Sequence, residues 1–203
     1  EERRPLAVWY DTVTVVRGGN GEMLRRVQRI VREDGSTTVL VNEADRRTLL
    51  PRRTTARRDD GEPFIDLSFD GTRVEGRRPL LPQNGGPGAA VPVELSLDLP
   101  RPVYDWRWWG LLIAALPLDR GYEARMLSFA TEATLPSPLL WITARVVGEE
   151  PVGRVECWVV EVDAGAPWTL WIARGGEAAP VQRIRVDRPD GAAVLWEPLS
   201  GSD

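Results

Sequence analysis

Four Asp-Gly dipeptides constrain the fold of this chain more than any other feature of its sequence. They are Asp34-Gly35, Asp60-Gly61, Asp70-Gly71 and Asp190-Gly191, and each stands between segments rich in β-branched, aliphatic or aromatic residues. Asp-Gly suits tight hairpins, because Gly takes a positive φ freely and Asp tolerates it better than most residues. Four such turns in 203 residues predict a mainly β, antiparallel protein.

The turns and the alternation of apolar residues divide the chain into two series of predicted strands. In the first series, residues 24–32 are expected to pair with 36–41, residues 52–58 with 64–69, and residues 64–69 with 72–75. The second series comprises residues 122–129, 139–147, 155–162, 168–173, 181–186 and 193–196. With residues 6–16 and 93–97, the total is roughly a dozen strands, spaced for antiparallel meander pairing.

Residues 6–16 alternate strictly, and both sets of side chains include large apolar residues. Val8 and Tyr10 point one way, whereas Trp9, Val13 and Val15 point the other. Successive side chains of a strand lie on opposite faces of its sheet. We therefore expect this strand to be covered on both faces.

A Pro- and Gly-rich stretch, residues 77–92, separates the two series. It contains four Pro and three Gly residues, which sustain neither a helix nor an inner strand. Neither half has an obvious closed core of its own. We therefore predict one long loop within a single domain, residues 1–203.

One segment, residues 104–116, breaks the β pattern. It reads Tyr-Asp-Trp-Arg-Trp-Trp-Gly-Leu-Leu-Ile-Ala-Ala-Leu and holds three of the nine Trp residues. Asp105 is the expected N-cap of a helix, and Pro117 ends that helix. The residues between them are apolar on nearly every side of the helix. A helix that is apolar on every side belongs inside a protein.

The economical arrangement is therefore a single curved antiparallel sheet, an open half-barrel, wrapped around this one short helix. The expected inner lining consists of large aliphatic strand residues: Leu24, Val39, Leu67, Ile142, Val160 and Ile172.

This order of elements resembles the periplasmic lipoprotein-carrier half-barrel superfamily, which sorts outer-membrane lipoproteins. The likeness rests on residues 148–162 (GEEPVGRVECWVVEV), on 168–173 (WTLWIA) and on 180–183 (PVQR), and the first half fits only in outline. These segments look like uncharacterised exported bacterial domains related to that carrier. The resemblance implies an open curved sheet around a helical plug, and its motifs are structural rather than catalytic.

The common catalytic constellations are missing from the sequence. The chain has no His, which excludes Ser-His-Asp and Cys-His arrangements and His-based metal sites. It has no phosphate-binding or dinucleotide motif, and we expect no cofactor and no metal. The 30 Asp and Glu residues leave a carboxylate-only enzyme formally open, but Glu149 and Glu150 are better explained as a solvated loop before a Pro turn.

Composition limits which binding partners and which cellular compartment are expected. The net charge of −4 argues against nucleic acid, and no apolar run approaches a membrane span. Because Cys157 is the only cysteine, the chain cannot form an internal disulfide. We expect Cys157 to act as a small apolar side chain that fills space between its neighbours. We expect an exported, periplasmic protein whose leader or anchor preceded Glu1 and was removed.

Basic residues also occur in local pairs. They are Arg25-Arg26, Arg52-Arg53 and Arg57-Arg58. These pairs fit a solvated sheet face, or contact with anionic lipid headgroups or a partner protein.

The Trp residues carry the functional hypothesis. Trp9, Trp141, Trp158 and Trp171 are most simply core residues, whereas three indoles within four positions at 106–109 cannot all face one way. We expect a non-enzymatic binding protein for a lipid or an acylated peptide. Its predicted ligand-binding residues are Tyr104, Trp106, Trp108, Trp109, Leu112, Trp141, Trp158 and Trp171. The alternative is a structural or protein-interaction module of the cell envelope, with a fully packed interior and no small ligand.

Overall fold

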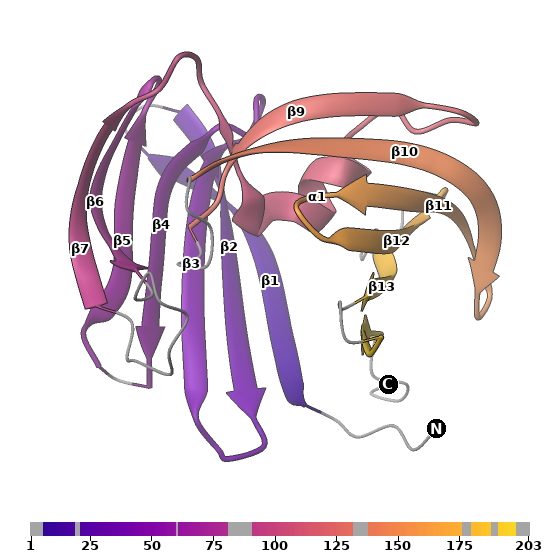
Figure 1. Ribbon diagram of the computed structural model, residues 1–203, viewed down its shortest axis with the longest axis horizontal. Coiled ribbons are helices and arrows are strands. Elements are labelled where there is room, and N and C mark those ends of the chain that lie inside the picture. The colour runs from indigo at the N-terminus through magenta and orange to yellow at the C-terminus, as the bar shows by residue number, and fades with distance from the viewer. Residues whose placement is uncertain are drawn as a thin grey trace. The chain divides into compact units, whose positions relative to one another are not determined.

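The computed structural model describes residues 6–18, 21–59, 61–80, 91–131, 138–175, 180–187 and 191–197. These residues form fourteen strands, one 3₁₀ turn and one short helix, α1 (Trp109–Ala114) (Figure 1). The strands of the first half are β1 (Ala7–Gly18), β2 (Gly21–Arg32), β3 (Thr37–Asp45), β4 (Pro51–Arg58), β5 (Pro63–Asp70), β6 (Arg73–Leu80) and β7 (Val91–Asp98). The others are β8 (Tyr104–Asp105), β9 (Glu123–Phe129), β10 (Leu139–Val152), β11 (Val155–Asp163), β12 (Pro167–Ala173), β13 (Val181–Asp187) and β14 (Ala193–Trp196).

The strands form two open sheets of seven. The first has the order β1-β2-β3-β4-β5-β6-β7, and the second has the order β14-β13-β12-β11-β10-β9-β8. All neighbours from β1 to β7 pair antiparallel, and so do those from β10 to β14. The prediction of a mainly β, antiparallel protein with one short helix is confirmed.

Contacts group the chain into two compact units. One contains residues 1–107 and 129–138, and the other contains residues 108–128 and 139–203. Each unit is described by itself below. The expectation of a single domain over residues 1–203 stays a prediction.

Asp60 and Asp190 lie outside the described residues, but all four Asp-Gly pairs fall between strands that are neighbours in their sheets, as the sequence predicts. They connect β2 to β3, β4 to β5, β5 to β6 and β13 to β14, and each of these pairs is antiparallel. Gly35, Gly71 and Gly191 have φ values of 80°, 57° and 82°. A positive φ strains any residue with a Cβ, which explains the use of Gly at these turns.

The expected single sheet of roughly a dozen strands is replaced by two sheets. The first meander ends at β7, and the next strand, β8, belongs to the second sheet. Pro100 and Pro102 lie between these two strands. Because Pro has no backbone N–H, two Pro residues in three positions cannot continue a hydrogen-bonded ladder.

The predicted loop at 77–92 is too long at both ends. Residues up to Leu80 belong to β6 and residues from Val91 belong to β7, with Pro79 opposite Pro92. The pairing of β6 with β5 stops at Arg77, so Pro79 has a ladder neighbour on one side only, where a missing N–H is tolerated. The middle of the predicted loop, residues 81–90, lies outside the described residues.

The predicted helix at 104–116 is shorter than expected. Tyr104 and Asp105 form β8, Trp106–Trp108 form the 3₁₀ turn, and α1 ends at Ala114, ahead of Pro117. Asp105 still acts as a cap, because its Oδ1 accepts a hydrogen bond from the Arg107 N–H at 2.9 Å.

Most of the predicted inner-lining residues are buried, and one prediction is wrong. Leu67, Ile142, Val160 and Ile172 are buried, and Leu24 is half-buried. Val39 pairs with Arg29 and Arg57 and therefore lies on the opposite face, where it is half-buried. Its neighbour Leu40 faces the core instead, because in a strand a shift of one residue changes the face.

The expectation that β1 is covered on both faces is also wrong. Tyr10 on one face, and Val13 and Val15 on the other, are exposed. Strand β1 is the terminal strand of its sheet and pairs with β2 through all twelve of its residues. Apolar alternation indicates a strand, but it does not show whether a second layer covers that strand.

Replacing Gly76 by Ala tests the tightest approach in the first sheet. Gly76 has a φ of 128°, and a Cβ there would lie 2.0 Å from the carbonyl oxygen of Asp66. We expect Gly76→Ala to lower the free energy of unfolding by at least about 2 kcal/mol, as measured by urea denaturation.

Gly148→Ala in β10 is the matched control, because a Cβ at Gly148 meets nothing within 4 Å. It should be neutral, or stabilise the fold by about 0.5 kcal/mol, because Ala has fewer unfolded conformations than Gly. Equal losses for the two variants would contradict this account.

Candidate functional site

The structure distributes the eight predicted ligand-binding residues over both units. Tyr104 and Trp106 belong to the first unit, and the other six belong to the second. Trp106, Trp108, Leu112 and Trp171 are buried, Tyr104, Trp109 and Trp158 are half-buried, and Trp141 is exposed. The expectation that Trp141 is a core residue is therefore wrong. As ligand-binding residues, all eight remain predictions.

Helix α1 packs against β12 and β13 within the second unit. Gly110 allows a close approach, because a Cβ at this position would lie 3.0 Å from Val181 Cγ2. Trp108, Leu112 and Ile113 are buried. Trp109 is half-buried, which matches the expectation that the three indoles of this segment cannot all be enclosed.

Trp109 begins a row of three neighbouring indoles in the second unit. Its ring centroid lies 5.6 Å from that of Trp168, and the two planes are tilted by 49°. The Trp168 ring stacks on Trp196 at 6.0 Å with an interplanar angle of 5°. These residues come from α1, β12 and β14, and all three are half-buried. We call them the tryptophan stack.

The tryptophan stack continues into the apolar face of the second sheet. Register places two rows of apolar residues side by side across β10 to β14: Ala144, Val162, Trp168, Val186 and Val194 in one, and Val146, Val160, Leu170, Ile184 and Trp196 in the other. Burial falls along both rows toward β14, where Val194 and Trp196 are half-buried. The partly exposed end of this face is therefore apolar and aromatic.

The sequence prediction missed Trp168 and Trp196 as members of this site. Alternation places Trp168 on the same face as Leu170 and Ile172, a signal that was available in the sequence. The contact between Trp168 and Trp196 depends on the hairpin from β12 through β14, so it is visible only in the fold.

Three of the other tryptophans carry an Arg guanidinium over the indole instead. Arg125 lies 4.5 Å from the ring centroid of Trp141, Arg174 lies 4.3 Å from Trp158, and Arg183 lies 5.3 Å from Trp171. Trp141 and Trp171 lie on the face of the second sheet opposite Trp158 and Trp168. The predicted set therefore does not form one continuous surface.

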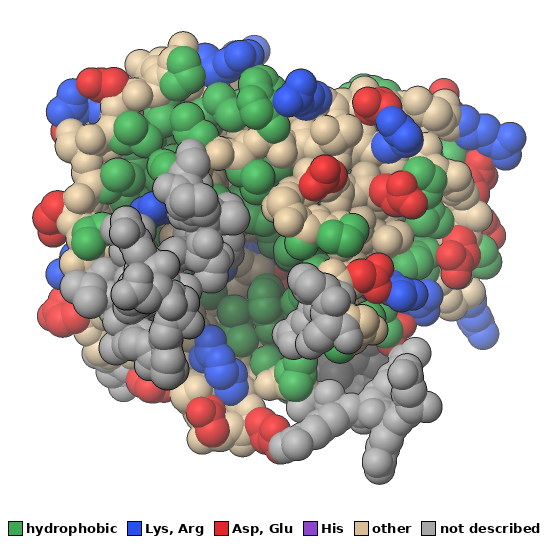
Figure 2. Space-filling model, in the orientation of Figure 1, with side chains coloured by type: hydrophobic (Ala, Val, Ile, Leu, Met, Phe, Trp, Pro, Cys, Tyr) green, Lys and Arg blue, Asp and Glu red, His purple; other side chains and the backbone are tan. Residues whose placement is uncertain are grey.

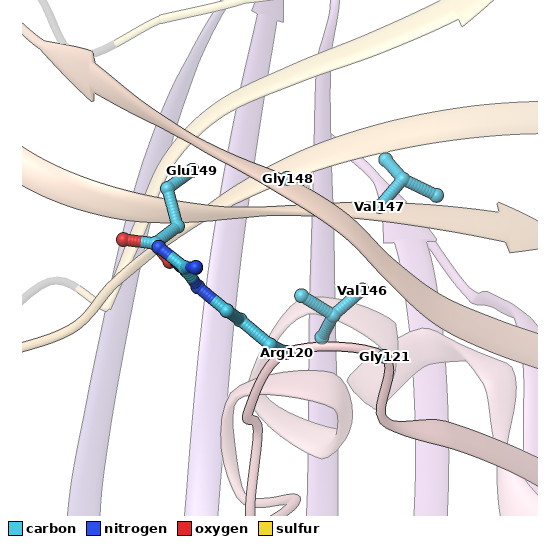
Figure 3. A pocket seen from close by; sticks show the side chains of 6 residues that line it. All are labelled: Arg120, Gly121, Val146, Val147, Gly148 and Glu149. Atoms are coloured by element: carbon cyan, nitrogen blue, oxygen red, sulfur yellow. Dashed lines mark hydrogen bonds and ion pairs between the residues drawn. The ribbon is translucent and has the colours of Figure 1, made fainter.

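A shallow pocket of about 460 Å³ opens beside β10 (Figure 3). Its lining includes Arg120, Val146 and Glu149, and Arg120 Nε lies 2.6 Å from Glu149 Oε1. Arg174 also pairs with Glu149. The hydrogen bond and the charge of Glu149 raise the pKa of Arg120. The charged groups of this pocket are already paired with one another.

The expectation that Glu149 and Glu150 lie in a solvated loop is wrong. Both belong to β10, where Glu149 is opposite Trp158 and Glu150 is opposite Cys157. Glu150 Oε2 accepts a hydrogen bond of 3.1 Å from the indole N–H of Trp171. The strand continues through Pro151 to Val152, because the turn to β11 is made by the next two residues, Gly153 and Arg154.

The first unit contains a buried polar cluster on the face of its sheet. Arg26, Asn42 and Thr54 lie side by side across β2, β3 and β4, and all three are buried. Arg26 Nε donates to Asp11 at 3.0 Å, and Arg26 Nη1 donates to the carbonyl oxygen of Arg107 at 2.8 Å. The Thr54 hydroxyl donates to the buried Asp105.

The cluster corrects the expectation for one of the basic pairs. Arg25 is exposed and pairs with Glu43, but Arg26 is only 4% exposed and lies on the buried face of the sheet. The exposed residues Arg52, Arg53, Arg57 and Arg58 agree with a solvated face. Adjacent residues of one strand point to opposite faces, so Arg25 and Arg26 differ in burial although they are neighbours in the sequence.

Cys157 is buried, and burial raises the pKa of its thiol. A raised pKa lowers the fraction of reactive thiolate, which agrees with a role as apolar filler. Among the described residues, no group of three His, Cys, Asp or Glu side chains is placed to hold a metal ion.

The charges on the surface are mixed in sign. Figure 2 shows acidic and basic side chains interspersed over the face that it draws. Many of them are paired, such as Arg53 with Asp66 and Arg145 with Glu123. Within the described ranges, no helix is both long and apolar enough to span a bilayer.

Comparison with protein families gives a match over most of the chain. The model of a family described as a protein of unknown function, DUF3108, matches residues 10–195, and the chain belongs to this family. The matched range extends from β1 to β14 and so includes both sheets and α1. Comparisons with curated proteins and with solved structures give no match.

Replacing Asn42 by Leu tests the buried polar cluster. Asn42 is fully buried, and neither its amide oxygen nor its amide nitrogen has a hydrogen-bond partner among the described residues. Because an unpaired buried polar group costs about 1–3 kcal/mol, we expect Asn42→Leu, of similar shape, to raise the free energy of unfolding by about 1 kcal/mol.

Thr38→Val is the matched control on the same strand and face. The Thr38 hydroxyl accepts a hydrogen bond of 2.9 Å from Arg32 Nη1, so its loss should lower stability by about 1 kcal/mol. A loss of stability in Asn42→Leu would instead mean that a bound water or ion satisfies the Asn42 amide.

Proposed function

We propose that this chain is an exported, non-enzymatic bacterial protein that binds an apolar or lipidic ligand between α1 and the second sheet. The observation that carries the proposal is the tryptophan stack of Trp109, Trp168 and Trp196. Its rings touch in series at 5.6 and 6.0 Å and are half-buried at the end of an apolar sheet face. Half-buried indoles at the rim of an apolar face are typical of binding surfaces.

The chemistry of this surface suits an acyl chain or another apolar group. Affinity would come from apolar area removed from water, at about 25 cal/mol per Å². The neighbouring face residues are aliphatic, including Val186 and Val194, and offer no acid, base or nucleophile. Arg183 and Arg185 are on the opposite face of β13, alternating with Ile184 and Val186, so they would meet an acidic headgroup only at the edge of the sheet.

The proposal includes a relationship to the periplasmic lipoprotein carriers. It is supported by the order of elements, with one strand series, a short apolar helix and a second strand series. It is also supported by the strands formed by the segments that carry the resemblance, β11, β12 and the start of β13. An exported location is part of the same proposal, because such carriers act in the periplasm.

The alternative function is an envelope module with a packed interior and no small ligand. The burial of Trp108 and Ile113, which are 1% and 0% exposed, favours it. Residues so completely enclosed contribute to stability rather than to recognition. The two functions therefore differ in what Trp109, rather than Trp108, contributes.

Replacing Trp109 by Ala separates these functions. We expect Trp109→Ala to weaken binding of palmitate or of a palmitoylated peptide about tenfold, equivalent to about 1.4 kcal/mol, because one ring of the stack is lost. Binding would be followed by intrinsic tryptophan fluorescence and by calorimetry. Thermal melting of the free variant would show that it is folded.

Leu195→Ala is the control, because Leu195 is exposed and lies on the face of β14 opposite Trp196. It should leave binding unchanged. If fluorescence and melting of the wild-type protein do not respond to fatty acids, phospholipid vesicles or acylated peptides, the binding function is wrong and the envelope module is preferred.

A further inference from the structure

Strand β1 is a long open edge of the first sheet. Among the described strands it pairs with β2 alone, in an unbroken register from Ala7 opposite Arg32 to Gly18 opposite Gly21 (Figure 1). The outer edge of such a strand presents backbone N–H and C=O groups that can pair with another strand. The register has no bulge, which is one of the devices that normally protect an edge.

The other sheet ends are protected in ways that β1 is not. Strand β7 carries Pro92 and the exposed acidic residues Glu94 and Asp98. Strand β14 has four residues and β8 has two. Short strands, Pro and charges are the usual protections of sheet edges. Strand β1 has twelve residues, no Pro and only two charged side chains, Asp11 and Arg17.

Strand β1 exposes apolar side chains on both of its faces. Tyr10 is 57% exposed on one face, and Val13 and Val15 are 41% and 49% exposed on the other. Exposed β-branched residues on a regular edge strand favour pairing with a further strand, because cross-strand contacts would cover them. The edge thus has both the backbone and the side chains of an interaction surface.

We propose that β1 pairs antiparallel with β1 of a second copy of this chain, about a two-fold axis at Thr14. In this register Val13 lies opposite Val15 of the second copy, and Thr12 lies opposite Val16 of the second copy. Asp11 lies opposite Arg17 of the second copy. By symmetry every contact away from Thr14 occurs twice, and the two seven-stranded sheets join into one.

Charge complementarity selects this register and this occupant. The strand has one acidic and one basic side chain, and centring the axis on Thr14 places each opposite the other. Pairing centred on Asp11 or on Arg17 would instead oppose like charges. The Arg17 side chain is 89% exposed, with Glu22 at 3.7 Å, so it can turn toward a partner. Asp11 Oδ2 already accepts hydrogen bonds from Arg26 and Gln28, whereas among the described residues Asp11 Oδ1 accepts only from Arg26 Nε and can take a second donor.

Disulfide trapping tests the register directly. Opposed residues of antiparallel strands have Cα atoms about 4.5–5.5 Å apart, within disulfide range. Thr14→Cys should therefore form a covalent dimer rapidly under mild oxidation. Thr12→Cys is the matched control, because its two copies would be four residues apart, about 13 Å. It should link slowly, and the double variant Thr12→Cys/Val16→Cys should restore linking. Native Cys157 is buried and stays in place.

Sedimentation equilibrium tests the assembly without new cysteines. The wild-type protein should be a dimer that dissociates on dilution. Val13→Lys should weaken dimerisation at least tenfold, because it places a charge at the centre of the new pairing. Val147→Lys, at a similarly exposed Val of the second sheet, should not. Thermal melting would show that both variants are folded.

The outcomes that would overturn the proposal are distinct. If the wild-type protein stays monomeric at high concentration, the partner of β1 is not a second copy of this chain. A strand of a different protein is then the preferred partner. A dimer that survives Val13→Lys, or equal linking of Thr12→Cys and Thr14→Cys, places the contact elsewhere.

Discussion

The first unit depends on the hydrogen bonds made by one buried group, the carboxylate of Asp105. It accepts hydrogen bonds from the Thr54 hydroxyl and the Arg107 N–H, while Arg26 reaches the Arg107 carbonyl oxygen and the Asp11 carboxylate. Burying charges is unfavourable unless they are paired and hydrogen-bonded. These contacts hold residues 105–107 on the face of the first sheet. Residues 105–107 are therefore fixed within the first unit, and Asp105 caps the 3₁₀ turn that follows it.

The second unit depends on packing, because its helix has little stability of its own. Helix α1 has six residues, its N-cap Trp108 makes no side-chain cap, and no charged residue complements its termini. Isolated helices of this length are unstable in water. Contacts with β12 and β13, including the close approach at Gly110, stabilise it instead. The same packing leaves Trp109 half-buried and brings it against Trp168, so the proposed ligand surface follows from the way the helix is held.

The two proposed interaction surfaces lie on different units and differ in physical character. The tryptophan stack offers rigid aromatic area to a small apolar ligand, whereas β1 offers backbone hydrogen bonds and β-branched side chains to another strand. The tryptophan stack uses no ionisable group, whereas β1 uses the charges of Asp11 and Arg17 to set its register. The family match, residues 10–195, covers most of β1 together with Trp109 and Trp168, and it ends one residue before Trp196.

The sequence by itself determined the local structure. The Asp-Gly turns and the apolar alternation located the hairpins and nearly every strand, and the all-round apolar segment located the helix, because these features depend on neighbours in the chain. Tertiary structure decided which strands share a sheet. The strands form two sheets instead of the expected one, and the division falls at Pro100 and Pro102. It also buried Arg26, exposed Trp141 and brought Trp109 to Trp168 and Trp196. Burial and contact depend on residues far apart in sequence, and no local pattern specifies which layer, if any, covers a given face.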